Sequence, residues 1–222
     1  MKRKPVIAID GPAGSGKSTI AKLVASGMGF HYIDTGAMYR AVTLKALGEG
    51  TDRKNEAALS ELAGRTKIDF VYGDRLKVFL DGAEVTDEIR LPEVSKASSD
   101  IADSRGVRAA LVKKQQEMGK AGGVIMDGRD IGSMVFPDAE VKIYLDASVE
   151  ERAERRFKEL SGKGIKTGQE QVRKDIEERD RRDRERPFGA LIKMNDAVTL
   201  DTTGLTIEQV AAKISGIIKG KL

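Results

Sequence analysis

The chain has 222 residues, of which 40% are hydrophobic and 33% charged, as in a globular protein with one α/β core and insertions. It has no cysteine and one histidine, which excludes a disulfide framework, a thiolate metal centre and a histidine-built zinc site. The net charge of +4 suits a phosphate-rich partner, either a nucleic acid or a small anionic substrate. No stretch approaches the roughly 20 apolar residues that span a membrane, and the first apolar run ends at Asp10, too soon for a signal peptide. We therefore expect a cytoplasmic protein.

The first motif is GPAGSGKS, from Gly11 to Ser18, which matches the phosphate-binding pattern G-x-x-x-x-G-K-[ST]. An apolar stretch at 6–9 precedes it, and apolar residues at helical spacing follow it up to Met28. In this strand–loop–helix context, the loop N–H groups and the helix N-terminus face phosphate oxygens. Lys17 supplies positive charge for the β- and γ-phosphates, and the Ser18 hydroxyl suits Mg²⁺. The motif predicts nucleoside triphosphate binding, but it does not separate a kinase from a GTPase or a motor.

Strands and helices alternate along the rest of the chain. We expect a strand at 31–33 and a helix at 37–47, then strands at 124–126, 141–145 and 198–200, and an amphipathic helix from 207 to 218. About five parallel strands with helices between them make a doubly wound sheet. Because parallel strands end at one edge, the acidic residues after them gather there: Asp10, Asp34, Asp127 and Asp146. We expect Asp34 and Asp146 to act as caps or structural partners.

Residues 66–86 depart from this alternation of strand and helix. Apolar residues occupy every second position on both sides of Gly73-Asp74, which predicts a hairpin with a two-residue turn. A third strand can follow Asp81-Gly82. We therefore predict a small antiparallel module inserted into the α/β core.

Residues 151–186 form a second exceptional region, with 13 basic and 10 acidic residues in two predicted helices joined by Ser161-Gly162-Lys163-Gly164. Arginines at helical spacing mark one face of each helix: Arg152, Arg155 and Arg156 on the first, and Arg179, Arg182 and Arg186 on the second. The interleaved charges fit a solvated helix pair held by salt bridges. They also fit a mobile lid that brings arginines over a triphosphate.

The phosphate loop, the segment DTGAMYR at 34–40, the segment DGRDIG at 127–132 and the arginine-rich region together resemble bacterial cytidylate kinases along nearly the whole chain. The resemblance implies an α/β P-loop nucleoside monophosphate kinase fold. This fold has a five-stranded parallel sheet with helices on both faces, an inserted antiparallel β module and a helical Arg-rich lid. It implies transfer of the γ-phosphoryl group of ATP to CMP or dCMP, with Mg²⁺. The implied domains are a P-loop core (1–35, 109–150 and 187–222), a CMP-binding region (36–108) and a lid (151–186).

The phosphate loop and the resemblance also assign site residues. Those assigned to ATP are Gly11, Pro12, Ala13, Gly14, Ser15, Gly16, Lys17, Ser18 and Thr19. Those assigned to CMP are Thr35, Tyr39, Arg40, Ser99, Arg108, Arg129, Asp130, Arg179, Asp183 and Arg186. Ser18 and Asp127 are assigned to Mg²⁺, directly or through water. The residues assigned to catalysis are Lys17, Arg129, Arg152, Arg155 and Arg156.

The implied base contacts suit the chemistry of cytosine. The Asp130 carboxylate can accept a hydrogen bond from the N4 amino group, and Arg108 can donate to N3 or O2. Uracil presents an acceptor where cytosine presents N4, so a site built for cytosine rejects uracil by leaving buried groups unpaired.

Other classes of protein fit the sequence less well. A GTP-binding switch would carry an N-K-x-D motif, which the segment KMND at 193–196 does not match. A nucleic-acid-binding protein would combine clustered positive charge with stacking aromatic residues, whereas only 5% of this chain is aromatic and its arginines alternate with acids. Among kinases, another monophosphate kinase or a small-metabolite kinase is the alternative. We expect a monomer with no nucleic-acid or membrane partner.

Overall fold

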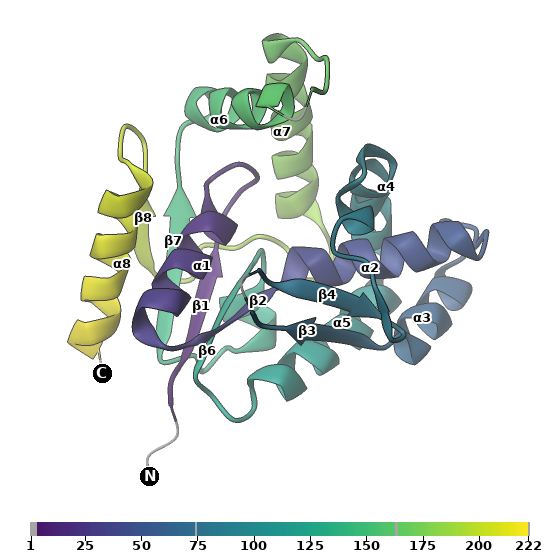
Figure 1. The fold of residues 1–222 in the computed structure, drawn as a ribbon, viewed down its shortest axis with the longest axis horizontal. Coiled ribbons are helices and arrows are strands. Elements are labelled where there is room, and N and C mark those ends of the chain that lie inside the picture. The colour runs from purple at the N-terminus through teal and green to yellow at the C-terminus, as the bar shows by residue number, and fades with distance from the viewer. Residues whose placement is uncertain (1–3, 74, 163, 222) are drawn as a thin grey trace. The chain divides into compact units, whose positions relative to one another are not determined.

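The apolar stretch before the phosphate loop forms the strand β1 (Val6–Asp10; Figure 1). Every residue of this strand is buried. It lies at the centre of a five-stranded sheet with the order β2-β6-β1-β7-β8. The other strands are β2 (His31–Asp34), β6 (Val124–Gly128), β7 (Val141–Asp146) and β8 (Val198–Asp201). Buried strands with apolar residues on both faces are typical of a parallel sheet covered by helices. The predicted sheet is therefore confirmed, with each strand one or two residues longer than expected at its end.

The computed structural model describes residues 4–73, 75–162 and 164–221, which divide into two compact units. Unit 1 comprises the chain up to Tyr32 and from Ala121 onward, and unit 2 runs from Ile33 to Lys120. Asp74 of the predicted turn and Lys163 of the predicted bend lie outside the described residues. Within the described part of the chain, no helix is long and apolar enough to cross a membrane.

In unit 1, α1 (Lys17–Met28) follows the phosphate loop and packs against β6 and α8 (Ile207–Lys221). The predicted stripe of the last helix accounts for this packing, since Val210, Ile214 and Ile218 are buried. A π-helical turn, η2 (Ile131–Val135), follows β6 and contacts β1.

The arginine-rich region forms the predicted helix pair, α6 (Val149–Gly162) and α7 (Gln169–Glu185), which lie side by side in unit 1 (Figure 1). Ala153, Val172 and Ile176 are buried between them. The prediction that α7 carries Arg186 is wrong, because the helix ends one residue earlier.

The described residues of unit 2 form four α-helices, of which the sequence predicted only α2 (Thr35–Gly48). This helix begins two residues earlier than expected, because the Asp34 carboxylate caps it by accepting from the Ala37 N–H at 2.8 Å. The three helices that were not predicted are α3 (Glu56–Arg65), α4 (Pro92–Asp103) and α5 (Arg105–Gly119).

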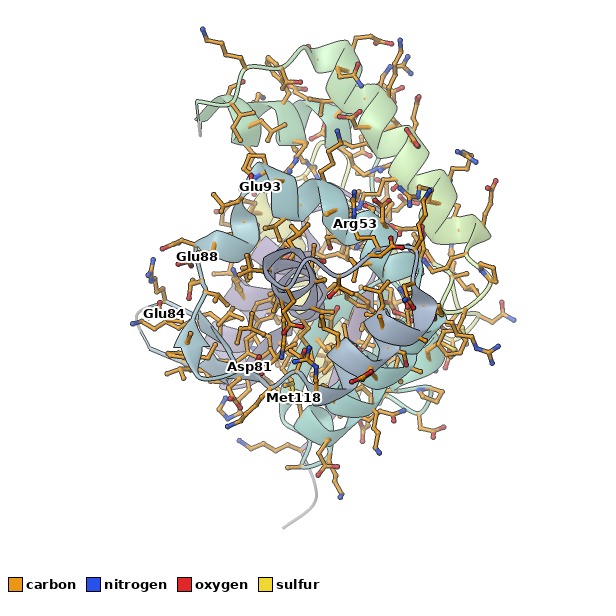
Figure 2. The ribbon with its side chains drawn as sticks, turned by 90° about the vertical axis from the view of Figure 1, so that its right-hand side faces the viewer. Arg53, Asp81, Glu84, Glu88, Glu93 and Met118 are labelled. Carbon is orange, nitrogen blue, oxygen red and sulfur yellow. The ribbon has the colours of Figure 1, made fainter. Side chains whose placement is uncertain are left out.

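The predicted antiparallel module is a three-stranded sheet in unit 2. Its strands are β3 (Ile68–Val71), β4 (Lys77–Leu80) and β5 (Ala83–Glu84). Figure 2 labels Asp81, which lies at the second turn of this sheet, and Glu84, which lies in its third strand. Lys45 of α2 forms an ion pair with Asp81 at 2.5 Å. The prediction of a two-residue first turn is wrong, since β3 ends at Val71 and β4 begins at its partner Lys77.

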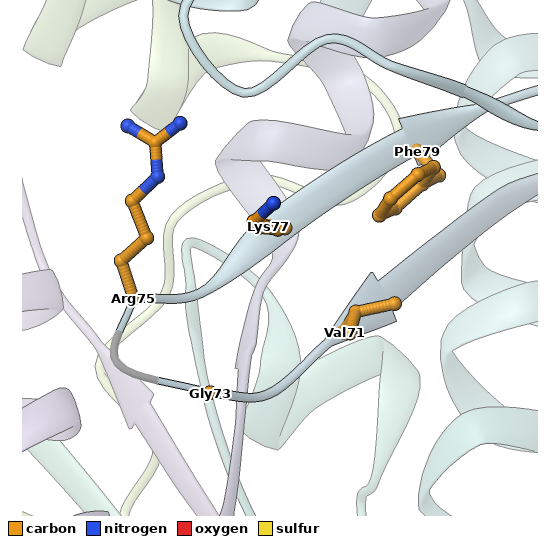
Figure 3. Close-up of a pocket in the computed structure, with 5 residues that line it drawn as sticks. All are labelled: Val71, Gly73, Arg75, Lys77 and Phe79. Atoms are coloured by element: carbon orange, nitrogen blue, oxygen red, sulfur yellow. The ribbon is translucent and has the colours of Figure 1, made fainter.

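Successive side chains of β3 and β4 point to opposite faces of the hairpin, so the two faces carry different residues. Ile68 pairs with Leu80 and Phe70 with Val78, so these four side chains share one face. The opposite face carries a shallow pocket lined by Val71, Gly73, Arg75, Lys77 and Phe79 (Figure 3).

Candidate active site

The phosphate loop connects β1 to α1 and packs closely against the end of β7. Gly11 has a φ of 154°, and a Cβ there would lie 2.0 Å from the Leu145 carbonyl oxygen. Only glycine can therefore occupy this position. Gly16, at a φ of 85°, precedes the first turn of α1 and directs the chain into the helix.

Lys17 lies inside the loop, with 5% of its surface exposed. Its Nζ donates to the Pro12 carbonyl at 2.6 Å and to the Ser15 hydroxyl at 3.1 Å. Burial lowers the pKa of Lys17 well below its ordinary value, and the nearby Arg129 acts in the same direction. The Lys17 side chain is therefore held beside loop oxygens in a buried environment, where a bound anion would favour its charged form.

Asp127 is the second-last residue of β6, lies next to the start of α1 and is 5% exposed. It accepts hydrogen bonds from the Ser18 hydroxyl at 2.8 Å and from the Tyr32 hydroxyl at 2.7 Å. Within the described residues, no group of three or more His, Cys, Asp or Glu side chains could hold a metal ion. Mg²⁺ needs no such group, because it binds through one or two protein oxygens together with waters and phosphates. The Ser18–Asp127 pair fits that requirement, and Tyr32 is a partner that the sequence analysis missed.

Asp10 links the strand before the phosphate loop to the DGRDIG segment. Its carboxylate accepts from the Ile131 N–H at 2.9 Å and from the Gly132 N–H at 2.7 Å. Burial raises the pKa of Asp10 to about 6, although these two backbone hydrogen bonds oppose the rise. The residue thus fixes the backbone that follows Arg129 and Asp130, and Asp130 itself is buried.

Three of the residues assigned to CMP meet in unit 1. Arg129 Nε contacts Asp183 Oδ2 at 2.7 Å, and Arg186 Nη2 contacts Asp183 Oδ1 at 2.9 Å. Burial alone would raise the pKa of Asp183, but Arg129, Arg179 and Arg186 hold it well below its usual range. The carboxylate therefore stays ionised and orients two guanidinium groups.

Arg152 has a different set of partners from the other arginines of α6. It is 2% exposed, and its Nη1 contacts the Ala13 carbonyl at 2.9 Å and Asp180 Oδ2 at 2.5 Å. The sequence analysis missed Asp180. Its position in the sequence could have indicated that it is buried, since Asp180 follows Val172 and Ile176 at helical spacing on the buried face of α7.

The remaining two arginines of α6 do not converge with Arg152. Arg155 contacts Glu151 at 2.9 Å, and it also donates to the Thr202 hydroxyl at 3.1 Å and the Thr202 carbonyl at 2.9 Å. Arg156 forms an ion pair with Glu159 at 2.7 Å on the exposed side of the helix.

In unit 2, the residues assigned to CMP lie on α2, α4 and α5. Arg40 contacts the capping residue Asp34 at 3.3 Å, and its Nε is buried without a hydrogen-bond partner among the described residues. Thr35 is buried in the first turn of the same helix. A buried donor with no partner is costly, which makes Arg40 a candidate for binding an anion.

Arg108 and Tyr39 form the second group in unit 2. The Arg108 guanidinium lies over the Tyr39 ring, 5.3 Å from its centre, and its Nη1 donates to the Ala102 carbonyl at 3.1 Å. Arg108 is 2% exposed, and Ser99 is half-buried on α4. The aromatic face and the carbonyl fix the guanidinium in one orientation.

The sheet, the phosphate loop with its lysine and the Ser18–Asp127 pair define a P-loop nucleoside triphosphate-binding protein. The family model described as cytidylate kinase matches residues 7–220. The chain belongs to the cytidylate kinase family, which confirms the resemblance.

Curated relatives agree with this assignment, and a solved structure shares the fold. The chain is 54% identical over 215 residues to the cytidylate kinase of Bacillus pumilus (strain SAFR-032), covering 96% of each chain. It is 51% identical over 221 residues to that of Bacillus thuringiensis (strain Al Hakam), covering 99% of this chain and 98% of the relative. A crystal structure of shikimate kinase from Acinetobacter baumannii in complex with shikimate has a TM-score of 0.50 at 15% identity, covering 98% and 94% of the two chains. That likeness concerns the fold alone.

Proposed function

We propose that this protein transfers the γ-phosphoryl group of ATP reversibly to CMP and dCMP, forming CDP and dCDP in pyrimidine nucleotide metabolism. The family assignment supports the reaction. The structural observation that supports it most is the phosphate loop. This loop holds Lys17, and at the start of the following helix Ser18 is hydrogen-bonded to Asp127.

Phosphoryl transfer passes through a loose transition state, so catalysis depends on positioning and on positive charge. In the proposed mechanism, the loop from Gly11 to Thr19 holds the phosphates of ATP. Lys17 exchanges its loop acceptors for phosphate oxygens and neutralises the charge that develops during transfer. The acceptor is a phosphate that is already ionised near neutral pH, so the reaction needs no general base.

Ser18 and Asp127 would hold Mg²⁺, Ser18 through its hydroxyl and Asp127 directly or through water. When bound, the ion supplies charge neutralisation for the phosphates of ATP. Tyr32 orients Asp127 by donating to its other oxygen at 2.7 Å. Holding the carboxylate in one rotamer leaves less conformational freedom to be lost on binding.

The acceptor nucleotide is bound mainly by arginines in this proposal. Arg40 and Arg129 bind its monophosphate, for which a bidentate guanidinium is well suited. Arg108, Ser99 and Asp130 read the cytosine edge. The remaining assigned residues contact the ribose, the base or the phosphates: Thr35, Tyr39, Arg179, Asp183 and Arg186.

The helix pair α6–α7 is proposed to be a lid that excludes water, which otherwise would accept the phosphoryl group. For Arg155 and Arg156 to act on ATP, they would have to exchange their present partners, Glu151, Thr202 and Glu159, for phosphate oxygens. We further propose that the protein works as a cytoplasmic monomer and does not bind nucleic acid.

The acceptor specificity is the decisive test. Purified protein is supplied with ATP and Mg²⁺ and with CMP, dCMP, UMP, AMP or shikimate, and nucleotide products are separated by chromatography. We expect CMP and dCMP to give kcat/KM values at least about tenfold above those of the other acceptors. An acceptor that leaves buried hydrogen-bonding groups of the site unpaired lowers kcat/KM by at least that factor. Lys17→Ala serves as the inactive control. A preference for shikimate or AMP would contradict the proposal.

A further inference from the structure

Arg152 is the most enclosed cation of the helix pair, and all of its contacts hold backbone or a carboxylate in place. Its Nε donates to the Ala147 carbonyl at 2.9 Å, just after β7. Its Nη1 donates to the Ala13 carbonyl and to Asp180. The side chain therefore connects the end of β7, the phosphate loop and α7 at one point.

Asp180 completes a closed arrangement around Ala13. One carboxylate oxygen accepts from Arg152, and the other accepts from the Ala13 N–H at 3.0 Å. The N–H and the C=O of Ala13 are thus both bound by the ion pair. The packing is close as well, because a Cβ on Gly14 would lie 3.0 Å from the Arg152 carbonyl oxygen and 3.1 Å from its Cβ.

We propose that Arg152 and Asp180 are positioning residues for the phosphate loop, which act on ATP through the backbone of Ala13 and not by contacting the transferred phosphoryl group. This inference rests on the proposed function, because it concerns how the same loop binds ATP. The pair holds the loop open in its bound shape, so that the amides after Ala13 face the phosphates without a further loss of backbone freedom. The Ala13 N–H belongs to Asp180 and is not a phosphate donor.

Burial decides against the alternative, in which Arg152 swings out to the triphosphate. Asp180 is 2% exposed, and the departure of Arg152 would leave its carboxylate buried with the Ala13 N–H as its remaining hydrogen-bond partner among the described residues. Removing one partner of a buried ion pair is strongly unfavourable, because the remaining charge is not compensated. The pair is therefore a permanent part of the loop's support.

The test compares Arg152→Gln with Asp180→Asn. The dissociation constant for Mg²⁺ and a non-hydrolysable ATP analogue is measured by calorimetry, and kcat is measured at saturating ATP and CMP. Positioning predicts that both variants weaken analogue binding by about tenfold or more while kcat at saturation falls less than about threefold, as for an interaction made equally in the ground and transition states. Arg173→Gln, which breaks exposed contacts to Glu170 and Glu177 on α7, is the matched control and should bind normally.

Direct action by Arg152 predicts the opposite pattern. Asp180→Asn would then release the guanidinium and leave both analogue binding and kcat unchanged or improved, whereas Arg152→Gln would lower kcat by about a hundredfold or more. Either result overturns the proposal.

A double variant covers failure of the single variants to fold. Arg152→Met combined with Asp180→Leu removes both charges, a replacement that buried ion pairs often tolerate. If it binds the ATP analogue as tightly as the wild type, the proposal is wrong. The binding measurement contains no CMP, so it still tests the loop if the acceptor of this protein proves to be a different molecule.

Discussion

At the scale of single residues, the described site in unit 1 depends on charged groups that are buried and mutually oriented. Lys17 is held by loop oxygens, Asp127 by two hydroxyl groups, and Asp183 by two arginines. Burying each group without partners would be unfavourable, and its hydrogen bonds and ion pairs offset part of the free-energy cost of desolvation. The same partners fix the direction of each side chain, which is what a reaction governed by positioning requires.

Asp130→Ala is expected to reduce selectivity for CMP over UMP. CMP would lose a charge-assisted hydrogen bond from its N4 amine, on the order of 1.5–3 kcal/mol, whereas UMP has no donor there to lose. The ratio of kcat/KM for the two acceptors should therefore fall by at least about tenfold. Steady-state kinetics with both acceptors measure this ratio. An unchanged ratio, or a parallel loss of ATP affinity, would mean that Asp130 does not read the base.

Asp10 should impose a pH dependence on stability. Its pKa is about 6 in the fold and 3.8 ordinarily, so the fold favours the protonated form. The contribution of Asp10 to the free energy of unfolding is most favourable below pH 4. It is lost as the pH rises through 6, and the total loss is about 3 kcal/mol. Asp10→Asn does not titrate. Urea denaturation from pH 4 to pH 7.5 should therefore show the wild type losing about 2 kcal/mol of stability relative to Asp10→Asn, since part of the total loss occurs below pH 4. A constant difference across this range would contradict the shift.

At the scale of elements, the helix pair α6–α7 is held to the rest of unit 1 at one end. Arg152 and Arg155 lie in the first half of α6 and contact the phosphate loop and Thr202, while Asp180 and Asp183 lie in the second half of α7. The apolar contacts between the two helices involve Phe157 and Leu160 further out. We therefore expect any lid movement to be largest away from the anchored ends.

Hydrogen exchange can follow this movement. When ATP analogue and CMP are both bound, amides in the outer half of α6 and the first two turns of α7 should exchange more slowly, because closure reduces local opening. Amides beside Arg152 and Asp180 should change less, since their contacts already exist. Unchanged exchange throughout 152–186 with both sites saturated would identify the pair as a solvated surface structure.

At the scale of the whole molecule, a chain with net charge +4 must gather two polyanions. Exposed arginines of the helix pair add long-range attraction, whereas Lys17 acts at short range from inside the loop. Salt screens exposed charges over long distances and buried charges much less.

The two contributions can be separated by ionic strength. Raising it from about 0.1 M to about 1 M shortens the Debye length from about 10 Å to about 3 Å. The KM values for ATP and CMP should rise severalfold, while kcat changes by less than about threefold, because the charges that act during transfer are buried. Initial rates over a matrix of both substrates, with constant free Mg²⁺, provide the measurement. If kcat falls in proportion to kcat/KM, the exposed and buried charges do not have the separate roles proposed here.

The sequence by itself determined the elements whose signals are local. The phosphate loop, the buried strands and the apolar stripe of α8 follow from residue types at fixed spacing, which backbone geometry turns directly into structure. The helices α4 and α5 also had local signals that were overlooked. Pro92 occupies the first position of α4, and the Ser104 hydroxyl caps α5 by accepting from the Val107 N–H at 3.2 Å.

Tertiary structure alone decided which charged groups meet. Asp10 reaches a backbone 121 residues away, Tyr32 a carboxylate 95 residues away, and Asp180 the amide of a residue 167 positions before it. Spacing along one helix or strand says which face a side chain occupies, but the partner on that face comes from another element whose position depends on packing. The sequence likewise grouped Arg152, Arg155 and Arg156 on one face of a helix. Packing pairs Arg152 with Asp180 of α7 and Arg155 with Thr202, whereas Arg156 pairs with Glu159 three residues further along the same helix.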